Sequence, residues 1–375
     1  MGCMAALGFA GLVSGCARHH AGAPVPMIAR PAAVVEAIPR PIALPPDGIH
    51  GIYLTGWTAG VKRRFDALVG LVDRTELNAM VIDVKDDGKV SFDVGVPLVT
   101  KIGANRRMIS HIDRLIATLG AHHILPIARI ACFRDTPLAK AHPELAVQTA
   151  KGKVWFDKTH HAWLNPFDRR CWDYNVDVAL SAARHGFKVI QFDYVRFPSE
   201  GKVSTLVYRG EPKGKLRRDQ IREFLEYARS RIKPEGVWFS ADVFGLTSIV
   251  KDDMGIGQTR TNVAGEVDLL CPMVYPSHYA HGEYGIKDPN SSPHAIVHKS
   301  VADAVKRLQE VRTCRLCPWL QDFSLHGVRY GAKQVKAQLK AIRELGIKDF
   351  LLWNPKCRYT EAALARREQP ASGKL

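Results

Sequence analysis

The chain has 375 residues, of which 46% are hydrophobic and 24% are charged, and its formal net charge is +16 at pH 7. This ordinary globular composition excludes an intrinsically disordered chain and suits one large domain. The positive charge implies attraction to polyanions.

Residues 1–16 have the character of a secretion signal. They carry no charge, and their apolar run is too short to span a bilayer as a mature helix. The segment Leu12-Val13-Ser14-Gly15-Cys16 resembles the bacterial lipobox, in which small residues admit the signal peptidase and the cysteine is lipidated. This resemblance implies removal of residues 1–15 and a lipid anchor on Cys16. We therefore expect an exported, membrane-anchored lipoprotein that faces the periplasm or the cell surface.

Residues 17–47 are rich in proline and lack a periodic apolar face, which is typical of an extended flexible tether. At ~3.1 Å per residue the tether reaches on the order of 90 Å. Export argues against nucleic acid as the partner of the basic chain, and no nucleic-acid-binding motif is present. An anionic lipid or an envelope polymer fits the charge better, although a solvated basic surface with no dedicated partner explains it equally well.

Strand-like and helix-like stretches alternate after the tether. The predicted strands are residues 50–56, 79–85, 124–130, 189–195, 237–243, 268–275, 315–321 and 349–354. The predicted helices are residues 62–76, 108–119, 171–185, 219–233, 258–265, 293–311 and 333–345. Eight such units predict a closed (β/α)8 TIM barrel over residues 48–356, as a single α/β domain followed by a polar C-terminal tail at 357–375.

The long connections run from strand to helix, at residues 86–107, 131–170, 196–218 and 276–292. In such barrels the C-terminal ends of the strands hold the active site. Strand alternation places polar or aromatic side chains at that end of most strands: Asp83, Lys85, Arg129, Gln191, Asp193, Asp242, Tyr275, Gln321, Asp322, Trp353 and Asn354. One such aspartate is often structural, but their convergence at one end predicts a functional site.

The aromatic residues and the cysteines bear on which ligands the site could bind. Several aromatic residues near the predicted rim are suited to stacking on sugar faces, although core packing explains any one of them: Tyr53, Trp57, Trp155, Phe156, Trp163, Tyr275, Tyr279, Trp319 and Trp353. Cys314 and Cys317 lie three apart in a predicted strand and so on opposite faces, which disfavours zinc. We expect no metal and no other cofactor, and the sequence does not assign disulfide pairs.

Six segments resemble a family of bacterial glycoside hydrolases with an α-amylase-like barrel, much of which is a domain of unknown function. They are residues 51–55 (GIYLT), 81–86 (VIDVKD), 163–166 (WLNP), 192–198 (FDYVRFP), 272–276 (PMVYP) and 319–323 (WLQDF). The resemblance covers about residues 48–356 and implies a glycosidase-like barrel. It departs at two positions, because α-amylase-like enzymes have an arginine and a glutamate where this chain has Gln191 and Asp242.

We therefore predict a glycoside hydrolase that acts on a cell-envelope or other polysaccharide with two carboxylates. Asp193 is expected to be the nucleophile or base, and Asp242 the general acid. The expected substrate-binding residues are Asp83, Lys85, Arg129, Gln191, Arg196, Tyr275, Gln321, Asp322, Trp353 and Asn354, of which Asp83 and Asp322 are reserve catalytic candidates. The alternative is a lipid-anchored protein that binds envelope glycan without cleaving it.

Overall fold

The computed structural model describes residues 41–248, 252–308 and 314–367. The predicted signal segment, Cys16 and residues 17–40 of the predicted tether lie outside these ranges. Within them, no helix is long and apolar enough to cross a membrane.

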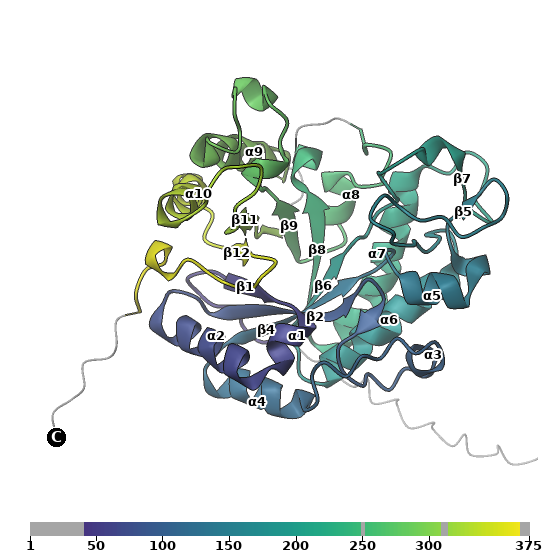
Figure 1. The fold of residues 1–375 in the computed structure, drawn as a ribbon, viewed down its shortest axis with the longest axis horizontal. Helices are drawn as coiled ribbons and strands as arrows, with labels where there is room; N and C mark the ends of the chain where they lie inside the picture. The colour runs from purple at the N-terminus through teal and green to yellow at the C-terminus, as the bar shows by residue number, and fades with distance from the viewer. Residues whose placement is uncertain (1–40, 249–251, 309–313, 368–375) are drawn as a thin grey trace, which may run out of the picture. The chain divides into compact units, whose positions relative to one another are not determined.

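Eight parallel strands form a closed barrel, which confirms the predicted (β/α)8 fold (Figure 1). They are β1 (His50–Leu54), β2 (Ala79–Asp86), β4 (Leu125–Ala131), β6 (Val189–Asp193), β8 (Trp238–Phe244), β9 (Leu269–Met273), β11 (Trp319–Gln321) and β12 (Phe350–Trp353). Closure comes from β1, which pairs in parallel with β2 on one side and with β12 on the other. β4 and β6 are buried along their whole lengths, as parallel strands covered by helices must be.

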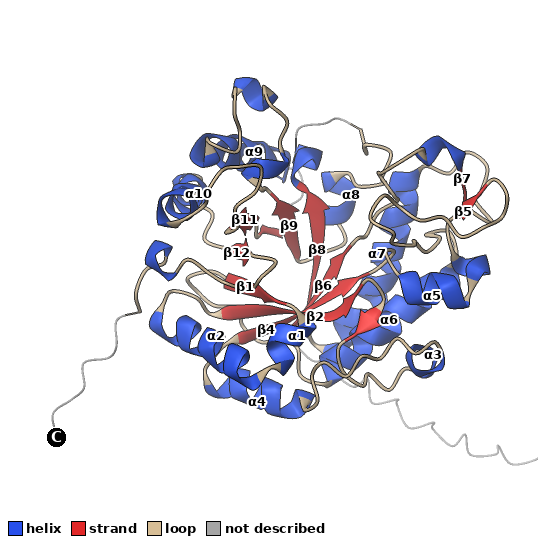
Figure 2. Cartoon of the chain, viewed as in Figure 1, coloured by secondary structure: helices blue, strands red, loops and turns tan. Residues whose placement is uncertain are grey.

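The helices lie on the outside of these strands, as the colouring by secondary structure shows (Figure 2). The longer ones are α2 (Lys62–Arg74), α4 (Ile112–Ala121), α6 (Arg169–Arg184), α7 (Arg217–Ile232), α9 (Pro293–Leu308) and α10 (Ala332–Glu344). The shorter ones are α1 (Gly56–Gly60), α3 (Pro97–Lys101), α5 (Thr136–Ala141) and α8 (Arg260–Ala264). In α2, the buried Phe65, Leu68 and Val72 are three and four residues apart and therefore share one face.

Small strands accompany the barrel. β3 (Lys89–Val90) pairs antiparallel with β2, while β5 (Gln148–Thr149) and β7 (Leu206–Val207) form a separate two-stranded sheet built from the long loops. The predicted strand at 315–321 is divided into β10 (Arg315–Leu316) and β11 by Cys317 and Pro318. Proline has no backbone N–H to donate to a ladder, which explains the interruption.

Residues 357–367 pack on the barrel, although they fall in the segment that we expected to be a polar tail. The hydroxyl of Tyr359 donates to the backbone oxygen of Tyr53 at 2.5 Å, and Leu364 is buried. The backbone N–H of Glu76, just after α2, donates to the oxygen of Ala365. The barrel domain therefore extends at least to residue 367.

Candidate active site

A pocket of about 390 Å³ lies at the C-terminal ends of the barrel strands. Six of the predicted site residues line it: Arg129, Asp193, Arg196, Asp242, Tyr275 and Trp353. Its volume lies within the usual range for ligand pockets, and it combines aromatic walls with a few converging charges.

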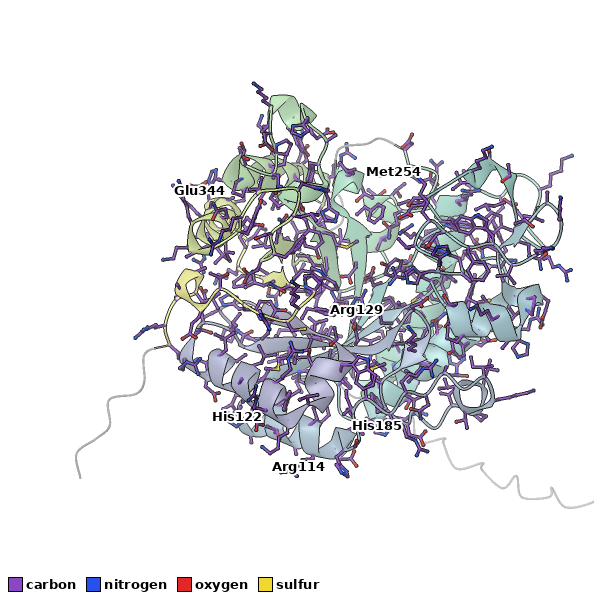
Figure 3. All side chains as sticks on the ribbon, in the orientation of Figure 1. Arg114, His122, Arg129, His185, Met254 and Glu344 are labelled. Atoms are coloured by element: carbon purple, nitrogen blue, oxygen red, sulfur yellow. The ribbon has the colours of Figure 1, made fainter. Side chains whose placement is uncertain are left out.

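Arg129 is the central cation of this site, and Figure 3 shows it near the middle of the barrel. Its Nε and Nη2 atoms donate to Oδ2 of Asp193 at 3.0 and 2.5 Å. The other oxygen of Asp193, Oδ1, accepts the N–H of Tyr194 at 2.6 Å. A guanidinium and a backbone N–H both stabilise the ionised form of a carboxyl group. Asp193 is therefore paired with a cation at the end of β6.

The opposite side of Arg129 contacts two more carboxyl groups. Its Nη1 donates to Asp83 at 2.6 Å and lies 3.4 Å from Asp86. The hydroxyl of Tyr53 donates to the second oxygen of Asp83 at 2.5 Å. Burial raises the pKa of Asp83 to about 7 despite the opposing effect of Arg129. Asp83 thus exchanges its proton near neutral pH.

Asp242, at the end of β8, has a different environment. Its Oδ1 accepts hydrogen bonds from Gln191 Nε2 at 2.6 Å and from Trp319 Nε1 at 2.7 Å. Among the described residues, none donates to its Oδ2. Burial, followed by repulsion from the nearby Asp193, raises the pKa of Asp242 well above its usual value. Asp242 therefore favours its protonated form, beside an Asp193 that is paired with Arg129.

The turn after β6 brings further groups into the pocket. Tyr194 has a φ of +51°, an uncommon conformation for a bulky residue that costs about 1–3 kcal/mol. The guanidinium of Arg134 lies 3.7 Å from the centre of its ring and donates to its hydroxyl, and Phe133 N–H donates to its backbone oxygen. These contacts hold the strained turn, and two residues later Arg196 again lines the pocket.

Lys85 does not line the pocket, although strand alternation placed it on the same face as Asp83. The register of β2 shifts between Asp83 and Lys85, which is the mark of a β-bulge. The fully buried Nζ of Lys85 donates instead to Asp135 at 2.7 Å and to Asn175 at 2.9 Å. Lys85 thus joins β2 to α5 and α6.

Three other predicted residues contact neighbouring loops. Gln321 accepts the N–H of Ser277 at 3.0 Å, and Asp322 accepts both the N–H and the hydroxyl of Thr360. Asn354 donates to the backbone oxygen of Asp322 at 2.5 Å. None of the three lines the pocket. In this structure they organise the loops at the rim.

Several pocket residues were not singled out as site residues from the sequence. They are Tyr194, Glu200, Phe244, Gly245, Leu246, Met273, His278, Tyr279 and Trp319. Trp319 was recognisable only as a rim aromatic, and its hydrogen bond to Asp242 connects β11 with β8 across the barrel. Most of the others lie in connections without periodicity, so a pattern of alternation does not reveal them. Among the described residues, no three His, Cys, Asp or Glu side chains are grouped as a metal site.

Comparisons with known proteins agree with this architecture. Residues 51–359 match the model of a family described as "Putative glycosyl hydrolase domain", which confirms the family resemblance of the sequence. No curated protein matches the chain. Among solved structures, a hypothetical protein from Ruminiclostridium thermocellum is 39% identical over 51% of this chain and 97% of its own, with a TM-score of 0.47.

Two structures with more complete coverage have similar folds. The glycoside hydrolase domain of PgaB (BpsB) from Bordetella bronchiseptica has a TM-score of 0.61 at 13% identity, covering 86% of this chain and 100% of that one. The catalytic domain of a β-amylase from Paenibacillus polymyxa has a TM-score of 0.53 at 10% identity, covering 86% and 96%. At these identities the similarity shows the fold alone.

Proposed function

Because the chain belongs to the glycosyl hydrolase domain family whose model matches residues 51–359, we propose that it hydrolyses glycosidic bonds of a cell-envelope or other polysaccharide. The observation that carries this proposal is the contrast between two carboxyl groups that line one pocket. Asp193 is paired with Arg129, whereas burial and the neighbouring Asp193 raise the pKa of Asp242. Glycoside hydrolysis requires one ionised and one protonated carboxyl group on the two sides of the scissile bond.

Each carboxyl group has one role in the proposed reaction. Asp242 donates its proton to the oxygen that leaves as the glycosidic bond breaks. Asp193 either attacks the anomeric carbon or takes a proton from the attacking water. Gln191 and Trp319 orient Asp242 through Oδ1, so that Oδ2 is the atom available to carry the proton.

The test is digestion of a glycan panel by the fragment of residues 46–375, with release of reducing ends as the measurement. We expect Asp193→Asn and Asp242→Asn each to lower kcat at least about 100-fold, as for loss of a general acid or base. Asp66→Asn is the control, because it removes an exposed carboxyl group on α2 that does not line the pocket. The assignment is wrong if both pocket variants retain the turnover of the unmodified protein.

A second function, binding of a glycan without cleavage, is favoured by the confinement of Asp242. Its side chain is 1% exposed and already accepts two hydrogen bonds, as a purely structural carboxyl group would. A binding protein would retain oligosaccharides in the pocket and release no reducing ends from any member of the panel. Binding and turnover measured on the same oligosaccharides therefore separate the two functions.

We also propose that the chain is an exported lipoprotein anchored through Cys16. The support is sequence alone: the uncharged apolar start, the lipobox-like residues 12–16 and the proline-rich segment after them. Cys16→Ser should release the protein from the membrane fraction and abolish incorporation of labelled palmitate, whereas Cys3→Ser should do neither. Continued fractionation of Cys16→Ser with membranes, together with no labelling of the unmodified protein, would contradict the proposal.

A further inference from the structure

Arg196 is a nearly buried cation in the pocket wall. Its side chain is surrounded by aromatic rings, with the guanidinium carbon 4.7 Å from the ring centre of Trp163, 4.6 Å from that of Phe244 and 5.3 Å from that of Tyr194. The residue is 6% exposed, and it lines the pocket. Within the described residues, no carboxylate lies within 4 Å of its guanidinium. The pocket therefore contains a positive charge without a counterion in the described part of the chain. Burying such a charge is unfavourable, so binding of an anion beside it would be favoured.

The unused hydrogen-bond donors of Arg196 lie on one edge of the guanidinium. Nη1 donates to Phe197 O at 3.1 Å and to Ser199 Oγ at 3.2 Å. Across the described ranges of the chain, neither Nε nor Nη2 has a hydrogen-bond partner. These two atoms form the edge of the guanidinium that can donate two parallel hydrogen bonds to a carboxylate.

The same edge binds carboxylates elsewhere in this protein. Arg129 uses Nε and Nη2 to hold Asp193, and Arg315 uses Nε and Nη2 to hold Asp349. Arg196, which lines the pocket, therefore leaves unused the same edge that the fold uses internally for carboxyl groups.

Neighbouring charges do not neutralise this edge. Arg134 shares the ring of Tyr194 with Arg196 and adds positive charge, although it has its own partner in Asp86 at 3.3 Å. Glu200 lines the pocket and attracts Arg196 electrostatically, but no direct ion pair joins their side chains. Asp193 lies on the same wall, but its oxygens are occupied by Arg129 and the N–H of Tyr194. A second anion can thus enter beside Arg196 while the catalytic carboxylates keep their own partners.

We propose that Arg196 binds the carboxylate of an acidic sugar residue, so that the substrate is a glycan that contains uronic acids or other carboxylate-bearing sugars. This inference rests on the proposed function, because it takes the pocket to be a glycan site. The chain's net charge of +16 agrees with it, since a basic protein attracts a polyanionic chain before any specific contact forms. The aromatic rings around Arg196 bury its guanidinium, and a charge pair is stronger in a buried site than in water.

The experiment compares pairs of oligosaccharides that differ only in charge. Acidic oligosaccharides from several uronic-acid polymers are used before and after chemical reduction of their carboxyl groups to primary alcohols, which leaves ring and linkage unchanged. Reducing-end release gives kcat/KM, and calorimetry gives Kd. We expect the unmodified protein to favour the acidic member of a pair by about 10- to 100-fold, the range for a charge-assisted bidentate contact.

Variants connect this preference to one side chain. Arg196→Gln should remove most of the preference for the acidic member. Arg196→Lys keeps the charge but lacks the pair of parallel N–H donors, so it should retain only part of the preference. Arg222→Gln is the matched control, because it removes the same charge from the surface of α7. It should leave the preference unchanged.

Four outcomes decide the inference. Equal kcat/KM and equal Kd for the two members of every pair overturn it, as does an Arg196→Gln variant that loses both members equally. A protein that cleaves only neutral glycans, with no gain from a carboxylate, keeps the proposed function and refutes the inference. A protein that cleaves nothing, yet binds the acidic member more tightly through Arg196, supports the inference and refutes the hydrolase.

Discussion

A single guanidinium, that of Arg129, stands among three carboxyl groups. Asp83, Asp86 and Asp193 all contact it, and Asp242 lies close enough to Asp193 for the two charges to repel each other. Asp86 is partly exposed and also pairs with Arg134, whereas the buried Asp83 and Asp193 share Arg129, so the carboxyl groups with the least favourable surroundings keep their protons. Asp83 and Asp242 are those groups, and of the two Asp242 lines the pocket as a proton donor.

The raised pKa of Asp83 predicts a pH-dependent stability. In the folded protein this pKa is about 7, whereas the ordinary value is 3.8. A raised pKa means that the contribution of Asp83 is fully present below about pH 4 and is lost as the pH rises towards 7. Asp83→Asn cannot lose a proton, so its unfolding free energy relative to the unmodified protein should rise over this interval, by as much as about 4 kcal/mol.

Urea unfolding at pH 4, 5.5, 7 and 8 measures this difference. Asn suits the position, because its oxygen can accept from Arg129 while its amide group faces the hydroxyl of Tyr53, which is able to accept. Asp66→Asn, on the exposed surface of α2, is the control and should give a difference that does not change with pH. A pH-independent difference for Asp83→Asn would show that Asp83 does not titrate in this range.

At the scale of elements, β2 shows where sequence reasoning succeeds and where it stops. Alternation correctly brought Asp83, Arg129, Asp193 and Asp242 to one end of the barrel, because parallel strands in register carry equivalent positions to the same edge. It failed for Lys85, because a bulge adds a residue to one strand without an unmistakable sequence signal.

The long loops are a second part of the structure that the sequence pattern does not predict. The contact of Arg134 with Tyr194 depends on the connection between β4 and α6, and this connection has no periodic pattern from which its path could be predicted. The packing of residues 357–367 was missed because it depends on hydrogen bonds such as that between Thr360 and Asp322. Pairings of this kind join positions far apart in the sequence, and local patterns do not encode them.

The Lys85–Asp135 pair predicts strong coupling between β2 and the loop that leads to α5. Both side chains are fully buried, so Lys85→Met should cost about 3–5 kcal/mol of unfolding free energy by leaving Asp135 without its counterion. The double variant Lys85→Met/Asp135→Asn should recover part of this loss. Asn still accepts the N–H of Leu138, which Asp135 caps in the structure at 2.9 Å.

A double-mutant cycle measured by urea unfolding tests the coupling, with an expected interaction of about 1–3 kcal/mol. The surface pair Lys62–Asp66 on α2 provides the matched cycle and should give at most about 0.5 kcal/mol. Additive losses in the buried cycle would mean that the two side chains do not stabilise each other.

At the scale of the whole barrel, the site is completed by the first and last strands. The ring of Tyr53 on β1 stacks on that of Trp353 at the end of β12, with ring centres 3.9 Å apart, and the guanidinium of Arg129 lies 5.3 Å from the ring of Trp353. Residues 357–367 stabilise this seam between β1 and β12, because Tyr359 donates to the backbone of Tyr53 and Thr360 donates to Asp322. The pocket is therefore sensitive to the C-terminal segment that follows the last strand.

Truncation tests this dependence. Ending the chain after Lys356 removes the burial of Leu364 and the donors of Asp322, and should cost on the order of 4 kcal/mol of unfolding free energy. Ending it after Arg367 keeps all of these contacts and is the control. Urea midpoints of the two truncated proteins compared with the full chain give the answer, and equal midpoints would show that residues 357–367 contribute nothing to closure.

The seam between β1 and β12 also bears on how the chain folds. The N–H of Ile49 bonds the carboxylate of Asp349, which lies 300 positions later in the sequence, and β1 has its second neighbour only when β12 is in place. Such distant pairing raises the contact order and slows folding. A ribosome that has not yet synthesised β12 therefore holds a nascent chain with unpaired strand edges, and the barrel reaches its native topology only after β12 has been synthesised.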